Sequence, residues 1–180
     1  MKALDRVLSG REARARLQRH ILMSAPTVVQ VSLNLPGYPK QLPGSRRLVE
    51  VVGDFMAGLI RSRSGRVLSS WMLENGMGTA FFLGACDVKA GEIKKAALSL
   101  EETPRWGAIL DVDVHVPQGA LSRTSLGLPP RRCFLCGRPA KECARAGRHE
   151  MEELRDAFEE YLQKGLRKMQ SSSHHVSGIA

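Results

Sequence analysis

Apolar and polar residues along the first sixty positions follow the period of a helix, then of a strand, then of a helix again. Residues 9–23 carry an apolar row at four-residue spacing, with arginines over the remaining surface, and Ser9 is a suitable N-terminal cap. Residues 27–35 place valine and leucine on one side and polar residues on the other, as in a strand. Residues 45–61 keep the helical period throughout and predict a central helix.

The middle of the chain predicts a β-hairpin. Residues 66–74 and 79–86 are strand-like and are joined across Asn75-Gly76, a dipeptide that strongly favours a hairpin turn. Residues 92–98 fit either a short helix or the start of another strand, and residues 98–101 look extended.

The last third of the chain begins with a strand and ends with a helix. Branched apolar residues recur over 106–116 and predict a strand. Residues 120–147 lack a clear period, and irregular stretches of this length are normally functional or held together by a metal. Residues 150–169 predict a closing helix with acids early and cations late, as the helix dipole favours. We expect a disordered tail over 171–180.

These elements indicate one α+β domain over residues 1–170, with a mixed, largely antiparallel sheet and helices packed on one face. A length of 180 residues suits a single domain, and a hydrophobic content of 43% is typical of globular proteins. A nucleotidyltransferase-like arrangement would suit the chemistry considered below, by analogy alone. The sequence contains neither a stretch resembling a membrane span nor the apolar core of a signal peptide, so we expect a cytoplasmic protein without membrane partners.

The chain is strongly basic. It contains 27 lysines and arginines against 18 acids, which gives a formal net charge of +9. An anionic partner is therefore favoured, and nucleic acid, a phosphorylated metabolite or an acidic protein would each fit. Aromatic residues make up only 5% of the chain, which argues against a surface on which nucleic-acid bases stack. Walker loops, a complete dinucleotide fingerprint and a serine-hydrolase elbow are also missing from the sequence.

Two acids interrupt the apolar strand at Asp111 and Asp113. Residues two apart on a strand share a face, so both carboxylates point the same way. Such a pair repels unless a cation lies between its members, and Mg²⁺ prefers carboxylate and phosphate oxygens. The pattern favours a magnesium site. The alternative is the solvent-facing side of an antiparallel strand, where aspartate is nevertheless disfavoured.

A second candidate site consists of Cys133, Cys136, Cys143 and His149. A Cys-x-x-Cys pair with one further cysteine and one histidine can form a tetrahedral zinc site. The spacings of the later ligands do not match a standard zinc finger. Buried or free thiols beside a helix-capping histidine are the main alternative, and redox-active thiols are another. We treat zinc as a structural hypothesis, in which the ion would staple residues 133–149.

Basic side chains gather in loops near these two candidates. Arg46 and Arg47 lie at the start of the 45–61 helix, whose free amides already favour an anion. Arginine binds phosphate through two parallel hydrogen bonds. A solvated surface explains any one of these residues, but their concentration favours phosphate binding. The candidate substrate-binding residues are Lys40, Arg47, Arg123, Arg131 and Arg132.

These motifs are more specific in combination than alone. In chain order they read Gly107-Ala-Ile-Leu-Asp111-Val-Asp113-Val, Leu121-Ser-Arg123, Leu128-Pro-Pro-Arg131-Arg132-Cys133-Phe-Leu-Cys136, and Ala140-Lys-Glu-Cys143-Ala-Arg145 ahead of His149. With this combination the chain resembles the citrate lyase holo-acyl-carrier-protein synthase family, also called apo-citrate lyase phosphoribosyl-dephospho-CoA transferase. The resemblance is dense over residues 98–150 and collinear from about residue 5.

The resemblance implies an enzyme that takes triphosphoribosyl-dephospho-CoA, attaches phosphoribosyl-dephospho-CoA to a serine of the acyl-carrier subunit of citrate lyase, and releases diphosphate. It implies a nucleotidyltransferase-type displacement, for which Asp111 and Asp113 would be the catalytic residues and hold Mg²⁺. Glu101 is a candidate third acid, its alternative being an ordinary surface glutamate. The basic set would bind the triphosphate or the acidic carrier.

Two other functions remain as alternatives. The first is a zinc-knuckle module that binds nucleic acid, against which the acid pair and the scarcity of aromatic residues in the basic loops both argue. The second is a non-catalytic assembly factor for citrate lyase, which would bind the carrier without transferring a group to it.

Overall fold

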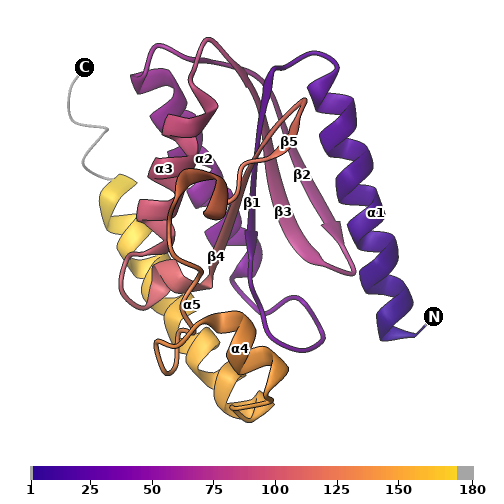
Figure 1. Cartoon of the computed structure of the whole chain (residues 1–180), viewed down its shortest axis with the longest axis vertical. Coiled ribbons are helices and arrows are strands. Elements are labelled where there is room, and N and C mark those ends of the chain that lie inside the picture. The colour runs from indigo at the N-terminus through magenta and orange to yellow at the C-terminus, as the bar shows by residue number, and fades with distance from the viewer. Residues whose placement is uncertain (1, 174–180) are drawn as a thin grey trace.

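The structure is a computed structural model that describes residues 2–173, with side chains described up to Met169. Its helices and strands form a single domain (Figure 1). In chain order they are α1 (Ala3–Leu22), β1 (Thr27–Leu33), α2 (Ser45–Ser62), β2 (Arg66–Asn75), β3 (Gly78–Cys86), α3 (Ala90–Glu101), the 3-10 helix η1 (Trp106–Ile109), β4 (Leu110–Val116), β5 (Gly119–Ala120), the 3-10 helix η2 (Thr124–Leu126), α4 (Ala140–Arg145) and α5 (Met151–Ser173).

The strands form one antiparallel sheet in the order β2-β3-β1-β4-β5. The central strand β1 pairs with β3 on one side and β4 on the other, so that Val31 lies opposite both Phe81 and Val112. Most of β1 is buried because helices cover both faces of the sheet. The predicted α+β class and the antiparallel sheet are confirmed.

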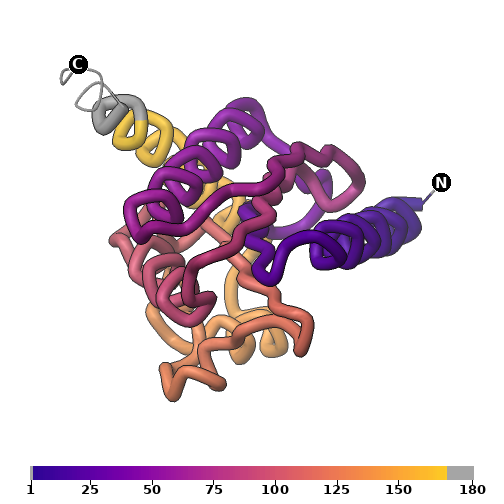
Figure 2. Tube along the Cα trace, turned by 90° about the horizontal axis from the view of Figure 1, so that it is seen from above, coloured from indigo at the N-terminus to yellow at the C-terminus, as the bar shows by residue number. Residues whose placement is uncertain are grey.

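The larger hydrophobic core lies between the sheet and α2, α3 and α5 (Figure 2). It joins Val29 and Val31 of β1 to Met56 of α2, Ile93 of α3 and Phe158 of α5. Branched and aromatic side chains on these elements therefore hold three helices against one face. Their common face agrees with the prediction that helices pack on one face of the sheet.

Helix α1 differs from that prediction because it packs on the opposite face. A second, smaller core joins Ile21 of α1 to Val28 of β1 and to Ala80 and Phe82 of β3. Val28 faces the same way as Gln30 and Ser32, two polar residues of β1. The opposite face is therefore apolar beneath the C-terminal half of α1 and polar further along β1 and β4.

Several predicted boundaries change. Helix α1 begins at Ala3, so Ser9 lies inside it rather than capping it. Residues 98–101 are the last turn of α3 and are not extended. The strand predicted from residue 106 begins at Leu110, after η1. Helix α5 continues to Ser173, which corrects the start of the predicted disordered tail; residues 174–180 of that tail lie outside the described residues.

Helix α3 supplies hydrogen bonds to the edge of β4. Lys94 Nζ donates to the carbonyl oxygen of Val112 at 2.7 Å, and the amide of Val112 donates to Glu101 Oε1 at 2.9 Å. β5 pairs with the end of β4, at His115 and Val116. Lys94 and Glu101 therefore form hydrogen bonds with the part of the β4 edge that β5 leaves unpaired. They also bring α3 against the strand that carries the acid pair.

Among the described residues, no helix combines the length and the apolar character that crossing a membrane requires.

Candidate active site and cysteine–histidine cluster

Asp111 and Asp113 point to the face of the sheet that also carries α1. Leu110, Val112 and Val114 are buried in the larger core, so the alternating aspartates face the other way. Their side chains are 41% and 38% exposed and line one cavity of about 530 Å³. The prediction that the two carboxylates share a face is therefore confirmed.

Four parts of the chain bring the other charged residues to this cavity. Helix α3 contributes Lys94 and Glu101, and the segment after β5 contributes Arg123. Arg131 comes from the stretch before the cysteines, and α4 contributes Lys141. The aspartates thus lie among four basic side chains, which is an arrangement suited to a polyanionic substrate.

Glu101 connects the strand edge to the arginines. Its side chain is 3% exposed, and Oε1 accepts the hydrogen bond from the Val112 amide. Oε2 lies 2.8 Å from Arg123 Nη2 and 2.9 Å from Arg131 Nη2. Both carboxylate oxygens therefore already have donors. This environment favours a positioning role over that of a metal ligand.

Arg131 links Glu101 to the acid pair. Its Nη2 also lies 3.1 Å from Asp111 Oδ1, so one guanidinium nitrogen joins carboxylates from α3 and β4. Arg123 makes a further ion pair at 2.8 Å with Glu102. These contacts hold both arginines at the rim of the cavity, and Arg131 is the nearer of the two to the aspartates.

Burial raises the pKa of both Asp111 and Asp113. The charge of Asp113 raises the pKa of Asp111 further, whereas Arg131 lowers it. For Asp113 the charge of Lys94 opposes the effect of burial, although Lys94 Nζ lies 4.0 Å away. Two negative charges are costly here, and a divalent cation between them would relieve that cost.

Lys94 is a site residue that the sequence interpretation missed. It is 4% exposed, although lysine is seldom buried unless it is paired. Lys94 and Glu101 are seven positions apart and lie on the same side of α3 as the buried Ile93 and Ala97. Lys94 and Glu101 interrupt the apolar stripe of this helix, and that interruption was the sequence signal that could have identified Lys94.

Arg14 of α1 is a second residue that was missed. It is 6% exposed, and its Nη2 donates to the carbonyl oxygens of Met77, Gly78 and Thr79 at 2.9 to 3.4 Å. Burial lowers its pKa, while the charges of Asp111 and Asp113 raise it. Arg14 therefore adds positive charge near the acid pair from the helix on the same face of the sheet.

The predicted basic residues do not all lie at the acid pair. Arg123 and Arg131 lie at the acid pair, as described. Lys40 lines a neighbouring cavity of about 360 Å³ and donates to the Leu35 carbonyl at 2.7 Å; burial, and then the charge of Arg155, lowers its pKa. Arg47 is exposed on α2 and pairs with Glu50 at 2.8 Å, away from the residues that line these cavities.

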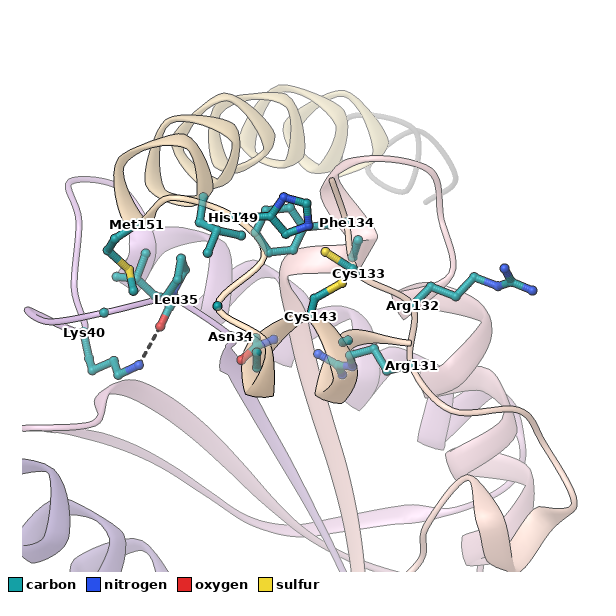
Figure 3. Close-up of a pocket in the computed structure, with 17 residues that line it drawn as sticks. Asn34, Leu35, Lys40, Arg131, Arg132, Cys133, Phe134, Cys143, His149 and Met151 are labelled. Atoms are coloured by element: carbon teal, nitrogen blue, oxygen red, sulfur yellow. Dashed lines mark hydrogen bonds between the residues drawn. The ribbon is translucent and has the colours of Figure 1, made fainter. Parts of the chain in front are cut away.

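Arg131 and Arg132 stand where several cavities meet. Both line the 360 Å³ cavity and a third cavity of about 340 Å³ next to Arg105 and Pro130, and Arg131 also lines the cavity of the acid pair. Arg132 is exposed and donates to the Gly137 carbonyl at 3.2 Å. In Figure 3 its guanidinium points away from the neighbouring cysteines.

The predicted metal ligands Cys133, Cys136, Cys143 and His149 come together. Their ligand atoms all lie within 4.8 Å of one another. Cys133 and Cys143 are buried, whereas Cys136 is exposed. Figure 3 shows Cys133, Cys143 and His149 beside the 360 Å³ cavity. Asp111, Asp113 and Glu101 form no comparably close group among the residues the structure covers.

The cysteines of this cluster differ in acidity. The backbone N–H of Arg138 lowers the pKa of Cys136 to about 6, although the desolvation of the thiol by its neighbours opposes the shift. Burial and the neighbouring sulfurs raise the pKa of Cys143 to about 11. The cluster thus contains one sulfur that readily carries negative charge.

Comparison with known proteins gives a consistent result. The family model described as apo-citrate lyase phosphoribosyl-dephospho-CoA transferase matches residues 2–165. A Streptococcus pyogenes protein named as a probable transferase of that kind is 31% identical over 97% of this chain and 93% of its own length. A Vibrio cholerae protein with the same name is 31% identical over 88% of this chain and 90% of its own length.

Proposed function

Since the chain belongs to the apo-citrate lyase phosphoribosyl-dephospho-CoA transferase family, we propose that it attaches phosphoribosyl-dephospho-CoA to a serine of the acyl-carrier subunit of citrate lyase. The donor is triphosphoribosyl-dephospho-CoA, and diphosphate is released. The observation that carries this proposal is the cavity in which Asp111 and Asp113 lie beside Arg131 and Lys94. It combines acids that can hold a cation with bases that can hold phosphates.

The reaction is a nucleotidyltransferase-type displacement. The serine Oγ of the carrier attacks the phosphorus attached to the ribose, and a new P–O bond forms. The bond from that phosphorus to the oxygen bridging it to the next phosphate breaks. That oxygen keeps the electron pair and leaves on diphosphate, and the serine proton passes to a base or to water. Negative charge therefore builds on the leaving group, and nearby cations stabilise it.

Asp111 and Asp113 are the residues that would hold Mg²⁺. They fit that ion because both carboxylates face one cavity and burial disfavours leaving them both charged without a cation. Bound there, Mg²⁺ would neutralise phosphate oxygens and the charge on the leaving diphosphate. The oxygens of Glu101 are occupied by the Val112 amide and the arginines, so Glu101 orients its neighbours instead.

The basic residues bind and orient the donor. Arg123 and Arg131 are held at the cavity rim by Glu101, which presents two guanidinium groups to a triphosphate. Lys94 adds a buried ammonium close to Asp113. The cavities on either side of Arg131 share Asn34, so a long donor would extend from the aspartates toward Lys40.

A reconstituted reaction tests the proposal. The protein is incubated with the apo-carrier subunit, Mg²⁺ and triphosphoribosyl-dephospho-CoA. We expect a mass gain on one carrier serine and an equal amount of diphosphate. Binding of the carrier without any mass gain would contradict transfer and support the assembly-factor alternative.

Two variants locate the chemistry. Asp111→Asn and Asp113→Asn should each lower the transfer rate by about 100-fold or more, because each removes a charged cation ligand. Asp54→Asn is the matched control, since Asp54 lies exposed on α2 and receives the same chemical change. Full activity in either of the first two variants would remove the acid pair from the mechanism.

A further inference from the structure

We propose that Cys133, Cys136, Cys143 and His149 bind one Zn²⁺ ion, which closes residues 131–149 into a small module and fixes Arg131 beside the acid pair. Cys136 Sγ lies 3.4 Å from Cys143 Sγ and 3.3 Å from His149 Nε2. Zinc bonds of about 2.3 Å to sulfur and 2.0 Å to nitrogen give tetrahedron edges of about 3.8 and 3.5 Å. Cys136, Cys143 and His149 are therefore already close to the spacing that one ion would require, and the ligand atoms of all four residues lie within 4.8 Å of one another.

The backbone around the first two cysteines forms a tight turn that suits a metal. The amide of Gly137 donates to the Cys133 carbonyl at 2.9 Å, and the amide of Cys133 donates to the Arg138 carbonyl. Gly137 has a φ of +72°, in the left-handed region that glycine adopts without strain. This turn directs both sulfurs toward the same point.

The remaining ligands come from two other elements. Cys143 projects from α4, and His149 lies just ahead of α5. Glu153, on the first turn of α5, has a carboxylate oxygen 3.8 Å from His149 Nδ1. A carboxylate beside the nitrogen that does not bind the ion is the usual partner of a zinc-binding histidine. The ion would thus tie together a turn, a short helix and the start of a long helix.

Apart from the ion pairs of Arg123 and Arg131, the segment around the cluster buries few side chains. Between residues 121 and 150 the buried positions are Cys133 and Cys143. Helix α4 is only six residues long, well below the length at which an isolated helix is stable. Phe134 adds one half-buried contact with Tyr161. The interior of this segment is the sulfur cluster itself, and a metal ion is the component that would make that interior stable.

The ligand set favours zinc over the alternatives. Three sulfurs and one imidazole in a compact group suit tetrahedral Zn²⁺. A disulfide between Cys136 and Cys143 would require their sulfurs to move from 3.4 Å to about 2.05 Å apart. It would also leave Cys133 and His149 without a role. An ion uses all four groups and accounts for why they meet.

The same segment places Arg131. The amide of Ala140, at the start of α4, donates to the Arg131 carbonyl at 2.9 Å, and Arg132 forms an isolated β-bridge with Pro139. The backbone of Arg131 is therefore fixed to the module that the ion would close, while its side chain reaches Asp111. This inference stands on the cluster geometry and does not depend on the transferase reaction.

Metal analysis of the intact protein is the first test. The full chain, purified without chelator and without added metal, should contain one zinc per chain. Replacement by Co²⁺ should give the visible absorption of tetrahedral cobalt together with thiolate-to-cobalt charge transfer. A chain that carries well under one zinc and gives no such spectrum would overturn the proposal, as would a Cys136–Cys143 disulfide in the freshly purified protein.

Two cysteine variants provide a matched comparison. Cys136→Ser should lose the zinc and the cobalt spectrum, and should expose residues 121–150 to protease. Cys86→Ser should keep one zinc per chain, because Cys86 lies on β3 and contacts Asp87 outside the cluster. Equal zinc content in the two variants would refute the assignment. Should Cys136→Ser fail to fold, the metal content and cobalt spectrum of the unaltered chain still decide the question.

Discussion

Lys94 and Glu101, two turns apart on α3, bind the carbonyl and the amide of a single residue, Val112. A helix thereby takes the place of a neighbouring strand along the middle of β4. It also brings one positive and one negative charge to the strand that presents Asp111 and Asp113. The pairing of the sheet edge and the electrostatics of the candidate active site therefore depend on the same two side chains.

Changes at Glu101 should separate its backbone role from its charge. Glu101→Gln keeps an oxygen for the Val112 amide but loses the ion pairs with Arg123 and Arg131. We expect a folded protein with a raised KM for the donor and a transfer rate reduced about tenfold or more. Glu101→Ala also leaves the buried Val112 amide without its acceptor and leaves each arginine with one carboxylate partner in place of two, so the free energy of unfolding should fall by about 3 kcal/mol in denaturant.

Glu102→Gln is the control for this pair of variants. Glu102 is exposed and forms an ion pair with Arg123, whereas Arg131 pairs with Glu101. The loss of the Glu102 charge should change the free energy of unfolding by no more than about 0.5 kcal/mol. The transfer rate should stay near that of the unaltered protein. Equal effects at the two glutamates would contradict the positioning role of Glu101.

Lys94→Met should damage both stability and transfer. The change leaves the Val112 carbonyl without its donor and removes the ammonium near Asp113. We expect a loss of about 2 kcal/mol in unfolding free energy and a transfer rate lowered about tenfold or more. Lys95→Met is the control, because Lys95 is exposed one position along α3. The prediction is wrong if the two lysine variants behave alike.

Asp113→Asn should stabilise the metal-free protein, although it lowers the rate of transfer. The folded-state pKa of Asp113 is raised by burial, so its charged form costs stability at neutral pH. The gain should be modest, up to about 3 °C in melting temperature, since the side chain is more than a third exposed and its charge is partly screened. Thermal unfolding of the unaltered protein and of the variant is measured in the presence of a metal chelator.

The sign of the pH dependence follows from that raised pKa. Below the unfolded-state value of about 3.9 the carboxyl is neutral in both states, and the two proteins should differ little. The advantage of asparagine should grow as the pH rises through the folded-state pKa and stay constant above it. A difference that shrinks with rising pH would contradict the raised pKa.

Mg²⁺ should raise the melting temperature of the unaltered protein even without substrate. An ion that binds only the folded state stabilises it by about 2.7 kcal/mol at 100 times its Kd, equivalent to several degrees for a chain of this size. The shift should disappear in Asp111→Asn and Asp113→Asn and persist in Asp54→Asn. An unchanged shift in the acid-pair variants would place the ion elsewhere.

Local patterns predicted two parts of the candidate site. The period of a strand was enough to place Asp111 and Asp113 on one face. The spacing of Cys133 and Cys136, together with Cys143 and His149, was enough to suggest a cluster that the structure does bring together. In both cases the relevant geometry lies within a short stretch of chain.

Contacts between distant elements could not be predicted in this way. Arg14 and Lys94 are buried because they bond backbone groups of other elements, and no local pattern specifies those partners. Glu101 was predicted on an extended segment because charged residues interrupt the apolar stripe of α3. Arg47 was predicted to bind the substrate because it lies at the start of a helix, but its side chain is exposed and pairs with Glu50.

Arg131 forms a wall common to the three cavities that meet at it. Because one side chain contributes to all three, a change at this position alters each of them together. Shortening it would enlarge the space beside the β4 carboxylates and remove the ion pair with Asp111. Under the proposed function, this position is the place to begin when redesigning the protein for donors with a bulkier phosphate chain.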